Sequence, residues 1–163
     1  MSIADFVNKM NPHPRSGPSI KFPVGGLLKI KGIVEENELQ NPKQFDADGK
    51  ASLTVIKNGN ATGVTIGRAT GIESFVREYR NHHPAKTSKE IPVYSYSHRD
   101  GAFSAPGDSG SIVVDGLGRI IGLLTGGSGR TTDTDVTYVT PYFWLEEQIK
   151  KAFPNSILYH PVD

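Results

Sequence analysis

The residues with the clearest capacity for chemistry lie in a turn at positions 105–111, Ala-Pro-Gly-Asp-Ser-Gly-Ser, which leads directly into the apolar run 112–114. Gly107 and Gly110 allow backbone dihedral angles that a Cβ atom would forbid. Ser109 on such a turn can serve as a nucleophile, and the N–H groups of Gly107 and Ser109 can stabilise the negative charge of a tetrahedral intermediate as an oxyanion hole. Because Gly, Asp and Ser are also ordinary turn residues, this stretch alone is more typical of a plain hairpin connection.

The segments that follow the turn exclude one class of enzyme and predict two strands. An esterase-type nucleophile elbow, G-x-S-x-G with a helix after it, is excluded because Ser111 occupies the last glycine position and the next residues favour a strand. Residues 112–114 and 119–125 predict strands joined by a glycine-containing turn, and a second glycine cluster follows at 126–129.

Together with two further segments, these residues resemble chymotrypsin-like serine peptidases, most closely the small bacterial streptogrisin type. The specific part of the resemblance is Ala-Pro-Gly-Asp-Ser-Gly at 105–110, followed by the strand at 121–129 that contains Thr-Gly-Gly-Ser. Supporting parts are the strand and turn at 55–63 and the strand at 136–140 that runs into a C-terminal helix. The resemblance extends from about Ser52 to about Phe153 and implies the second barrel of such a domain. Among proteins of this type, the chain resembles in general terms the intracellular fungal proteins that contain a trypsin-like domain.

The resemblance assigns roles to the turn residues. Ser109 is implied as the catalytic nucleophile, Gly107 and Ser109 as the oxyanion donors, and Asp108 and Gly110 as structural support for the loop. In the family the carboxylate at the position of Asp108 is buried, and a buried carboxylate needs a partner. Arg68 and Arg99 are candidates for that partner, while an exposed turn position for Asp108 is the alternative.

The resemblance also implies a substrate site. Thr125, Gly126 and Gly127 correspond to a strand edge that pairs with an extended peptide. Phe103 and Ser104 correspond to the start of the primary specificity pocket. Neither residue is acidic, so a preference for Lys or Arg lacks its usual anchor, and the two glycines favour a large apolar side chain.

A base for Ser109 is not identifiable in the sequence. The serine hydroxyl needs a histidine, oriented by a carboxylate, to take its proton, and in the family both residues come from a first barrel. The segment before the expected strand at Leu53 has no room for a further barrel, and its histidine, His13, lies between two prolines. The other histidines, at 82, 83, 98 and 160, are expected at the surface. No cofactor and no metal site are predicted, because adjacent residues such as His82 and His83 point in different directions.

Length and composition are those of one folded domain. The chain has 163 residues. Its formal charge of +1 gives no strong electrostatic field that would attract nucleic acid, and without a long apolar run no membrane-spanning segment is expected. No signal peptide is expected, and the lack of cysteine fits a reducing compartment, so a cytoplasmic location is predicted. We expect an N-terminal helix and connector over 1–50, and the barrel with its C-terminal helix over 51–163.

The expected fold is all-β, a six-stranded antiparallel Greek-key barrel of chymotrypsin type with a C-terminal α-helix. A first helix is predicted over residues 2–10 and the last from Pro141, with Thr140 as its N-cap. The segment 73–79 is compatible with either strand or helix. The expected strands lie at 53–57, 62–72, 91–97, 111–114, 119–125 and 136–140.

Two functions are compatible with these residues. The leading one is the C-terminal half of a chymotrypsin-like serine endopeptidase, which acts on a peptide or protein substrate but is inactive by itself. The alternative is a catalytically inactive peptide- or protein-binding module that kept the barrel. A lone second barrel should expose apolar surface. We therefore expect a complementary first barrel, a homodimer, or a cover from residues 1–50 that includes Phe6, Val7, Leu27 and Leu28.

Overall fold

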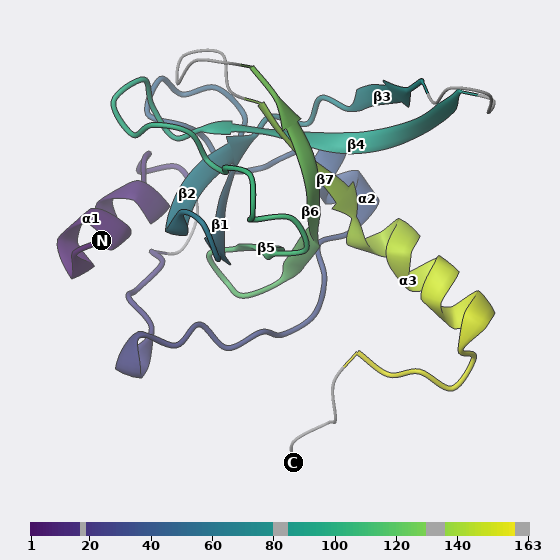
Figure 1. Cartoon of the computed structure of the whole chain (residues 1–163). Helices are drawn as coiled ribbons and strands as arrows, with labels where there is room; N and C mark the ends of the chain where they lie inside the picture. The colour runs from purple at the N-terminus through teal and green to yellow at the C-terminus, as the bar shows by residue number, and fades with distance from the viewer. Residues whose placement is uncertain (17–18, 80–84, 130–135, 159–163) are drawn as a thin grey trace.

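The computed structural model describes residues 1–16, 19–79, 85–129 and 136–158 (Figure 1). Strands dominate it, and helices lie mainly near the two ends of the chain. The helical elements are α1 (Ile3–Met10), the 3₁₀ turn η1 (Val24–Gly26), α2 (Glu36–Gln40) and α3 (Tyr142–Ala152). The strands are β1 (Leu53–Gly59), β2 (Gly63–Ala69), β3 (Ser74–Glu78), β4 (Lys86–Ser95), β5 (Ile112–Asp115), β6 (Ile120–Ser128) and β7 (Val136–Pro141).

Six of the strands close into an antiparallel barrel. The sheet order is β2-β1-β5-β6-β7-β4-β3, and an additional pairing of β2 with β4 joins the ring. All these strand pairs are antiparallel. The structure thus confirms the expected all-β fold, a closed six-stranded barrel followed by a C-terminal helix.

Alternation along the strands fills the barrel interior. In β1, Leu53 and Val55 belong to the inner core, whereas Ile56 belongs to a second cluster outside it, because successive side chains point to opposite faces of a sheet. The inner core is built mainly from branched aliphatic side chains of the strands. Its barrel members include Leu53, Val55, Ala69, Ile91, Val93, Val113, Ile121, Leu124 and Val139.

The N-terminal segment covers part of the barrel exterior. Ser2 and Asp5 form a reciprocal capping box that starts α1. Phe6 and Met10 of this helix are 3% and 1% exposed, and they pack with Ile56 and other outward-facing strand residues. Val7 and Leu28 are partly buried against the same cluster. Leu27 does not contribute as expected, because 81% of its surface is exposed.

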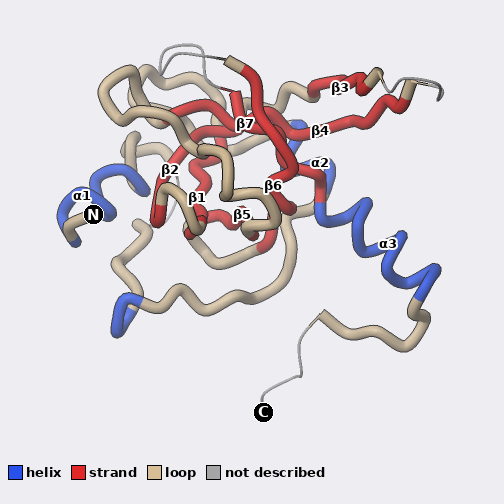
Figure 2. Tube along the Cα trace, in the orientation of Figure 1, coloured by secondary structure: helices blue, strands red, loops and turns tan. Residues whose placement is uncertain are grey.

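A hairpin formed by β3 and β4 extends beyond the barrel (Figure 2). The ambiguous segment at 73–79 is a strand, and β4 begins at Lys86 rather than near Ile91 as expected. The added residues are polar, and all but Glu90 are exposed, so they carry no hydrophobic alternation from which a strand could be predicted. Their extended form depends on the pairing of Ser74 with Glu90 through Glu78 with Lys86.

The C-terminal helix begins one residue later than expected. Pro141 is its N-cap and makes no side-chain cap bond, so the prediction of Thr140 as the cap is wrong. The Thr140 hydroxyl instead donates a 2.8 Å hydrogen bond to the carboxylate of Glu90 on β4. The hydroxyl that the local sequence pattern assigned to the helix N-terminus therefore forms a tertiary hydrogen bond instead.

The packing of α1 on the barrel yields a stability prediction. Phe6→Ala should lower the free energy of unfolding by about 3–5 kcal/mol, because it removes a buried aromatic ring from the outer cluster. Leu27→Ala, in the same N-terminal segment but exposed, should change it by less than about 0.5 kcal/mol. Urea unfolding of both variants measures the difference. Equal effects would mean that α1 is not docked on the barrel.

Candidate functional site

The turn that carries Ser109 consists of two successive reverse turns. The Asp108 N–H donates to the Ala105 carbonyl at 3.0 Å, and the Ser111 N–H donates to the Asp108 carbonyl at 3.0 Å. Gly107 and Gly110 have φ values of 106° and 86°, which lie in the region that favours glycine. The Ser109 residue between them is exposed.

The Asp108 side chain fixes this turn to the hairpin that joins β1 and β2. Asp108 is completely buried, and one carboxylate oxygen accepts from the N–H groups of Ala61 at 2.7 Å and Thr62 at 3.2 Å. The other oxygen accepts from the Thr62 hydroxyl at 2.7 Å and from the Ala105 N–H at 3.1 Å. The carboxylate therefore joins two loops that are far apart in sequence.

Lys57 supplies the compensating positive charge. Its Nζ lies 3.2 Å from Asp108 Oδ2, and both side chains are completely buried. Nζ also donates to the Thr62 hydroxyl at 2.5 Å and to the Gly63 carbonyl at 3.1 Å, and it lies 5.6 Å from the centre of the Phe103 ring. With these partners the buried ion pair has its hydrogen bonds satisfied, which is the condition under which such a pair is tolerated.

The β1–β2 hairpin can approach Asp108 closely because position 59 has no side chain. A Cβ atom at Gly59 would lie 2.3 Å from Asp108 Oδ1 and 3.0 Å from Lys57 Nζ. Neither atom could move away without breaking the buried pair. Gly59 therefore contributes to the site because it leaves the space that the Asp108 carboxylate occupies.

The expected partner of Asp108 was wrong. Arg68 pairs with Asp46, at 2.9 Å between Nη1 and Oδ2, and Arg99 is exposed in the turn after β4. Lys57 escaped prediction because it lies in an otherwise apolar strand, where a lysine is normally expected to point to solvent. Its place in the run Leu-Thr-Val-Ile-Lys was the available signal. The alternative of an exposed Asp108 is also wrong.

Burial alone would raise the pKa of Asp108. The opposing effects are larger in sum: hydrogen bonds from the Thr62 hydroxyl and from the N–H groups of Ala105, Ala61 and Thr62 favour the charged form. The pKa of this carboxyl therefore lies well below its ordinary value of 3.8. Asp108 is ionised at neutral pH and remains an acceptor for the whole cluster.

The Ser109 turn lies beside a free edge of β6. The Gly110 N–H donates to the Leu124 carbonyl at 2.8 Å, and the Leu124 N–H donates to the Ser111 carbonyl at 3.0 Å. Pairing between β5 and β6 ends with Ile112 and Leu123. Among the described strands, Gly126 and Gly127 therefore pair only with β7, and Thr125 pairs with none. A bulge at Thr125 interrupts the register with β7. The structure thus brings the predicted nucleophile and the predicted substrate edge together.

The two residues expected at the specificity pocket have other contacts. Phe103 is 1% exposed and belongs to the inner core, where it packs beneath Lys57. The Ser104 hydroxyl is bonded to the hydroxyl of buried Thr137 at 2.7 Å. Phe103 therefore packs in the core. The family pattern could not reveal this, because Gly67, which makes room for the ring, lies on β2, far from Phe103 in the sequence.

The described residues place no base in hydrogen-bond contact with Ser109. No hydrogen bond from its hydroxyl is found among residues 1–16, 19–79, 85–129 and 136–158. His13 packs against Phe45, with ring centres 5.8 Å apart, and His98 is exposed. The predicted surface positions of His82, His83 and His160 concern residues outside the described ranges. Over the same ranges, no group of three or more acidic or histidine side chains could hold a metal ion.

The N–H groups of Gly107 and Ser109 have no acceptor in the described structure. Both residues are exposed, and neither N–H takes part in the backbone bonds that close the turn. Two such donors in one loop provide hydrogen bonds for an anionic oxygen. Their assignment as an oxyanion hole remains a prediction.

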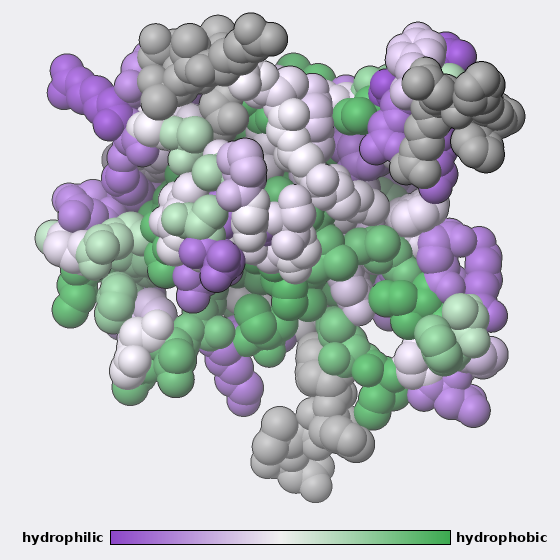
Figure 3. All heavy atoms as spheres, viewed as in Figure 1, coloured by the Kyte–Doolittle hydropathy of each residue, from purple (hydrophilic) through white to green (hydrophobic). Residues whose placement is uncertain are grey.

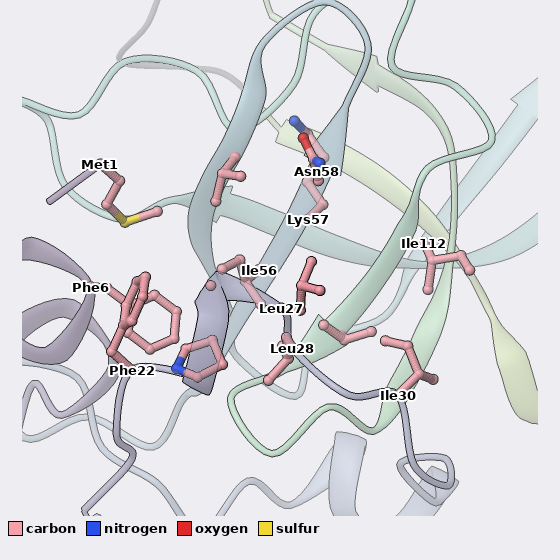
Figure 4. Close-up of a pocket in the computed structure, with 14 residues that line it drawn as sticks. Met1, Phe6, Phe22, Leu27, Leu28, Ile30, Ile56, Lys57, Asn58 and Ile112 are labelled. Carbon is pink, nitrogen blue, oxygen red and sulfur yellow. The ribbon is translucent and has the colours of Figure 1, made fainter. Parts of the chain in front are cut away.

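An apolar groove of about 510 Å³ lies on the barrel exterior near this turn. It separates residues 22–30 from β1 and β5, and Leu27, Leu28, Ile30 and Ile112 converge on it (Figure 4). Phe6 and Phe22 close one end with their rings edge to face, 5.3 Å between centres. Ile112 lines the groove, is 46% exposed, and lies three residues after Ser109 in the sequence.

Comparisons with known proteins give a partial likeness. No family model and no curated protein matches the chain. Among solved structures it is similar to chymotrypsin of Cellulomonas bogoriensis, protease A of Thermobifida fusca and a protease of Nocardiopsis, with TM-scores of 0.44, 0.49 and 0.49 and identities of 25%, 22% and 18%. The match covers 63%, 77% and 78% of this chain but 47%, 54% and 54% of those chains. The chain therefore spans about half the length of these structures.

No helix in the described part of the chain has the length and apolar character needed to cross a membrane.

The buried pair yields a prediction about stability. Lys57→Met should lower the free energy of unfolding by about 3–5 kcal/mol, because it leaves Asp108 buried without its cation. Lys150→Met removes a partner of the exposed pair between Lys150 and Glu146 and should cost no more than about 0.5 kcal/mol. Chemical denaturation compares the two, and similar losses would contradict the proposed anchoring of the turn.

The low pKa of Asp108 gives this stabilisation a defined pH dependence. A carboxyl whose pKa is lowered by folding stabilises the protein above its unfolded-state pKa and loses that contribution as the pH falls. The stability difference between the wild type and Asp108→Asn should thus be largest at pH 7 and smaller by about 1 kcal/mol at pH 3. Urea unfolding at both pH values measures it. A difference that grows on acidification would reverse the assigned direction of the pKa shift.

Proposed function

We propose that this chain is the nucleophile-bearing half of a chymotrypsin-like serine endopeptidase. The observation that carries the proposal is the exposed Ser109, held on a turn that a buried carboxylate locks, beside a free strand edge. The turn alone would be an ordinary connection. Its combination with the locked geometry and the free edge of β6 is what a peptide-cleaving site requires.

Each part has a role in the reaction. An extended peptide pairs with the edge of β6 at Thr125–Gly127, which places a carbonyl next to Ser109. The Ser109 hydroxyl attacks this carbonyl, and the N–H groups of Gly107 and Ser109 stabilise the resulting oxyanion. The proton of the hydroxyl passes to a base, which later returns it to the leaving amine.

The base comes from a second polypeptide unit in this proposal. The described residues offer none at Ser109, and the triad acts as a unit, so this chain by itself is inactive. The apolar groove at β1 and β5 is the surface on which a complementary barrel would pack, since exposed apolar patches of this kind mark interfaces. A second copy of this chain is the other candidate for that place.

A non-catalytic peptide-binding module is the second candidate function. The observation in its favour is that the free edge of β6 and the fixed turn are both present while a base is not. Such a module would bind an extended peptide in the same place. It would never form a covalent bond through Ser109.

Labelling with a fluorophosphonate probe tests the proposal. The chain alone should react at a rate close to that of its Ser109→Ala variant, because general-base assistance is worth roughly 10²–10⁴-fold. A complementary barrel that carries His and Asp, supplied as a separate or fused chain, should produce rapid stoichiometric labelling of Ser109. Intact-mass measurement gives the stoichiometry.

Ser111→Ala is a matched control, because it removes a neighbouring hydroxyl and keeps the nucleophile, so labelling of the complex should persist. Labelling that never appears in a complex shown to bind would favour the binding module. Rapid labelling of the chain alone would overturn the idea that the base comes from elsewhere.

A further inference from the structure

Glu90 is a buried carboxylate that the proposed reaction does not use. It is 6% exposed, and its Oε2 accepts hydrogen bonds from the hydroxyls of Thr140 at 2.8 Å and Thr125 at 3.5 Å. In the described chain no Lys or Arg forms an ion pair with it, and its neighbour Lys89 is instead paired with Glu73 at 2.7 Å. Burying a carboxylate without a cation costs free energy, so a positive group is the complement that the described residues do not supply to Glu90.

The neighbouring backbone is also incompletely paired. The pairing of β4 with β7 runs from Ile91 opposite Val139 to Tyr94 opposite Val136. At the Ile91 end the pairing stops with Val139, shortly before β7 itself ends at Pro141 and the chain turns into α3. Beyond that point β4 has only β3 beside it among the described strands, so residues 86–89 have one edge with no described strand partner. Figure 1 shows β4 and α3 diverging from the end of β7.

A groove of about 440 Å³ occupies the space between β4 and α3. Its walls are the free part of β4 on one side and Phe143 and Trp144 of α3 on the other, and Glu90, Thr125 and Thr140 line it between them. Trp144 is 49% exposed. A half-exposed aromatic wall beside a buried carboxylate suits a ligand with a flat cationic group on an apolar stem.

We propose that this groove binds an extended peptide segment that carries an arginine. The arginine guanidinium pairs with the Glu90 carboxylate, its stem lies along the aromatic wall, and the peptide backbone pairs with the free edge of β4. The guanidinium fork matches a carboxylate bidentately and stacks on aromatic rings, which a lysine ammonium does less well. Strand addition supplies backbone hydrogen bonds at an edge that is already extended.

This proposal goes beyond the proposed reaction and does not require it. Thr125 lines the groove through its hydroxyl, but Ser109 and the oxyanion donors lie beyond the other edge of β6, next to Leu124. Ser109→Ala should therefore leave peptide binding unchanged while it abolishes probe labelling. The two proposals can fail separately.

The fluorescence of Trp144 provides the readout, since the chain has a single tryptophan and it lines the groove. The wild-type chain is titrated with the pentapeptide acetyl-Thr-Val-Arg-Val-Thr-amide and with the same peptide in which neutral, isosteric citrulline replaces arginine. The arginine peptide should change the emission and bind at least about tenfold more tightly than the citrulline peptide.

Glu90→Gln keeps the shape of the side chain and should abolish this preference, so that the arginine and citrulline peptides bind with equal affinity. Glu147→Gln, which removes an exposed charge of α3 that does not line the groove, should preserve it. Equal affinity of the two peptides for the wild type, no change of emission with either, or an unchanged preference in Glu90→Gln would overturn the proposal. The comparison of peptides on the wild type holds even if Glu90→Gln fails to fold.

Backbone N-methylation tests the strand pairing separately. In an extended peptide only alternate N–H groups point to a given neighbouring strand. Of two arginine peptides, each methylated at one of two successive amides, one should lose binding about tenfold or more and the other should retain it. Equal affinity of both methylated peptides would overturn the pairing with β4.

Discussion

The buried ion pair between Lys57 and Asp108 is the interaction on which the candidate site depends. It holds together a hairpin and a turn that are far apart in sequence, and every donor around the carboxylate comes from one of these two loops. A buried charge that loses its partner is strongly destabilising, so neither loop can move without the other. The geometry of the Ser109 turn is thus fixed mainly by the hairpin between β1 and β2.

Among the described strands, barrel closure leaves part of an edge of β6 and part of an edge of β4 unpaired, and the two edges have different chemical surroundings. The edge of β6 becomes free where β5 gives way to the Ser109 turn, and the edge of β4 becomes free where β7 turns into α3. One edge adjoins a hydroxyl and unoccupied N–H donors, whereas the other adjoins a buried carboxylate. The two proposed ligands, an extended substrate at β6 and an arginine-bearing peptide at β4, would therefore occupy separate places on the same sheet.

The exterior of the barrel is covered only in part. Helix α1 buries Phe6 and Met10 on the outward faces of the strands. The following segment leaves Val24 and Leu27 exposed at 97% and 81%. Apolar side chains accordingly gather along the lower side of the molecule in Figure 3, below the strands. This distribution is typical of a surface that packs against another folded unit.

The sequence alone determined the features that depend on neighbouring residues. The capped first helix, the barrel strands, the glycine turns and the exposed position of Ser109 follow from local periodicity and turn chemistry. Tertiary structure alone decided the partner of Asp108, the core position of Phe103, the bond from Thr140 to Glu90 and the length of β4. Each of these depends on a residue distant in sequence, and in a closed barrel the ring of strand pairings decides which distant residues meet. Local pattern carries no information about that pairing, so a lysine in a mainly apolar strand and a glutamate in the middle of β4 acquire their roles only when the barrel closes.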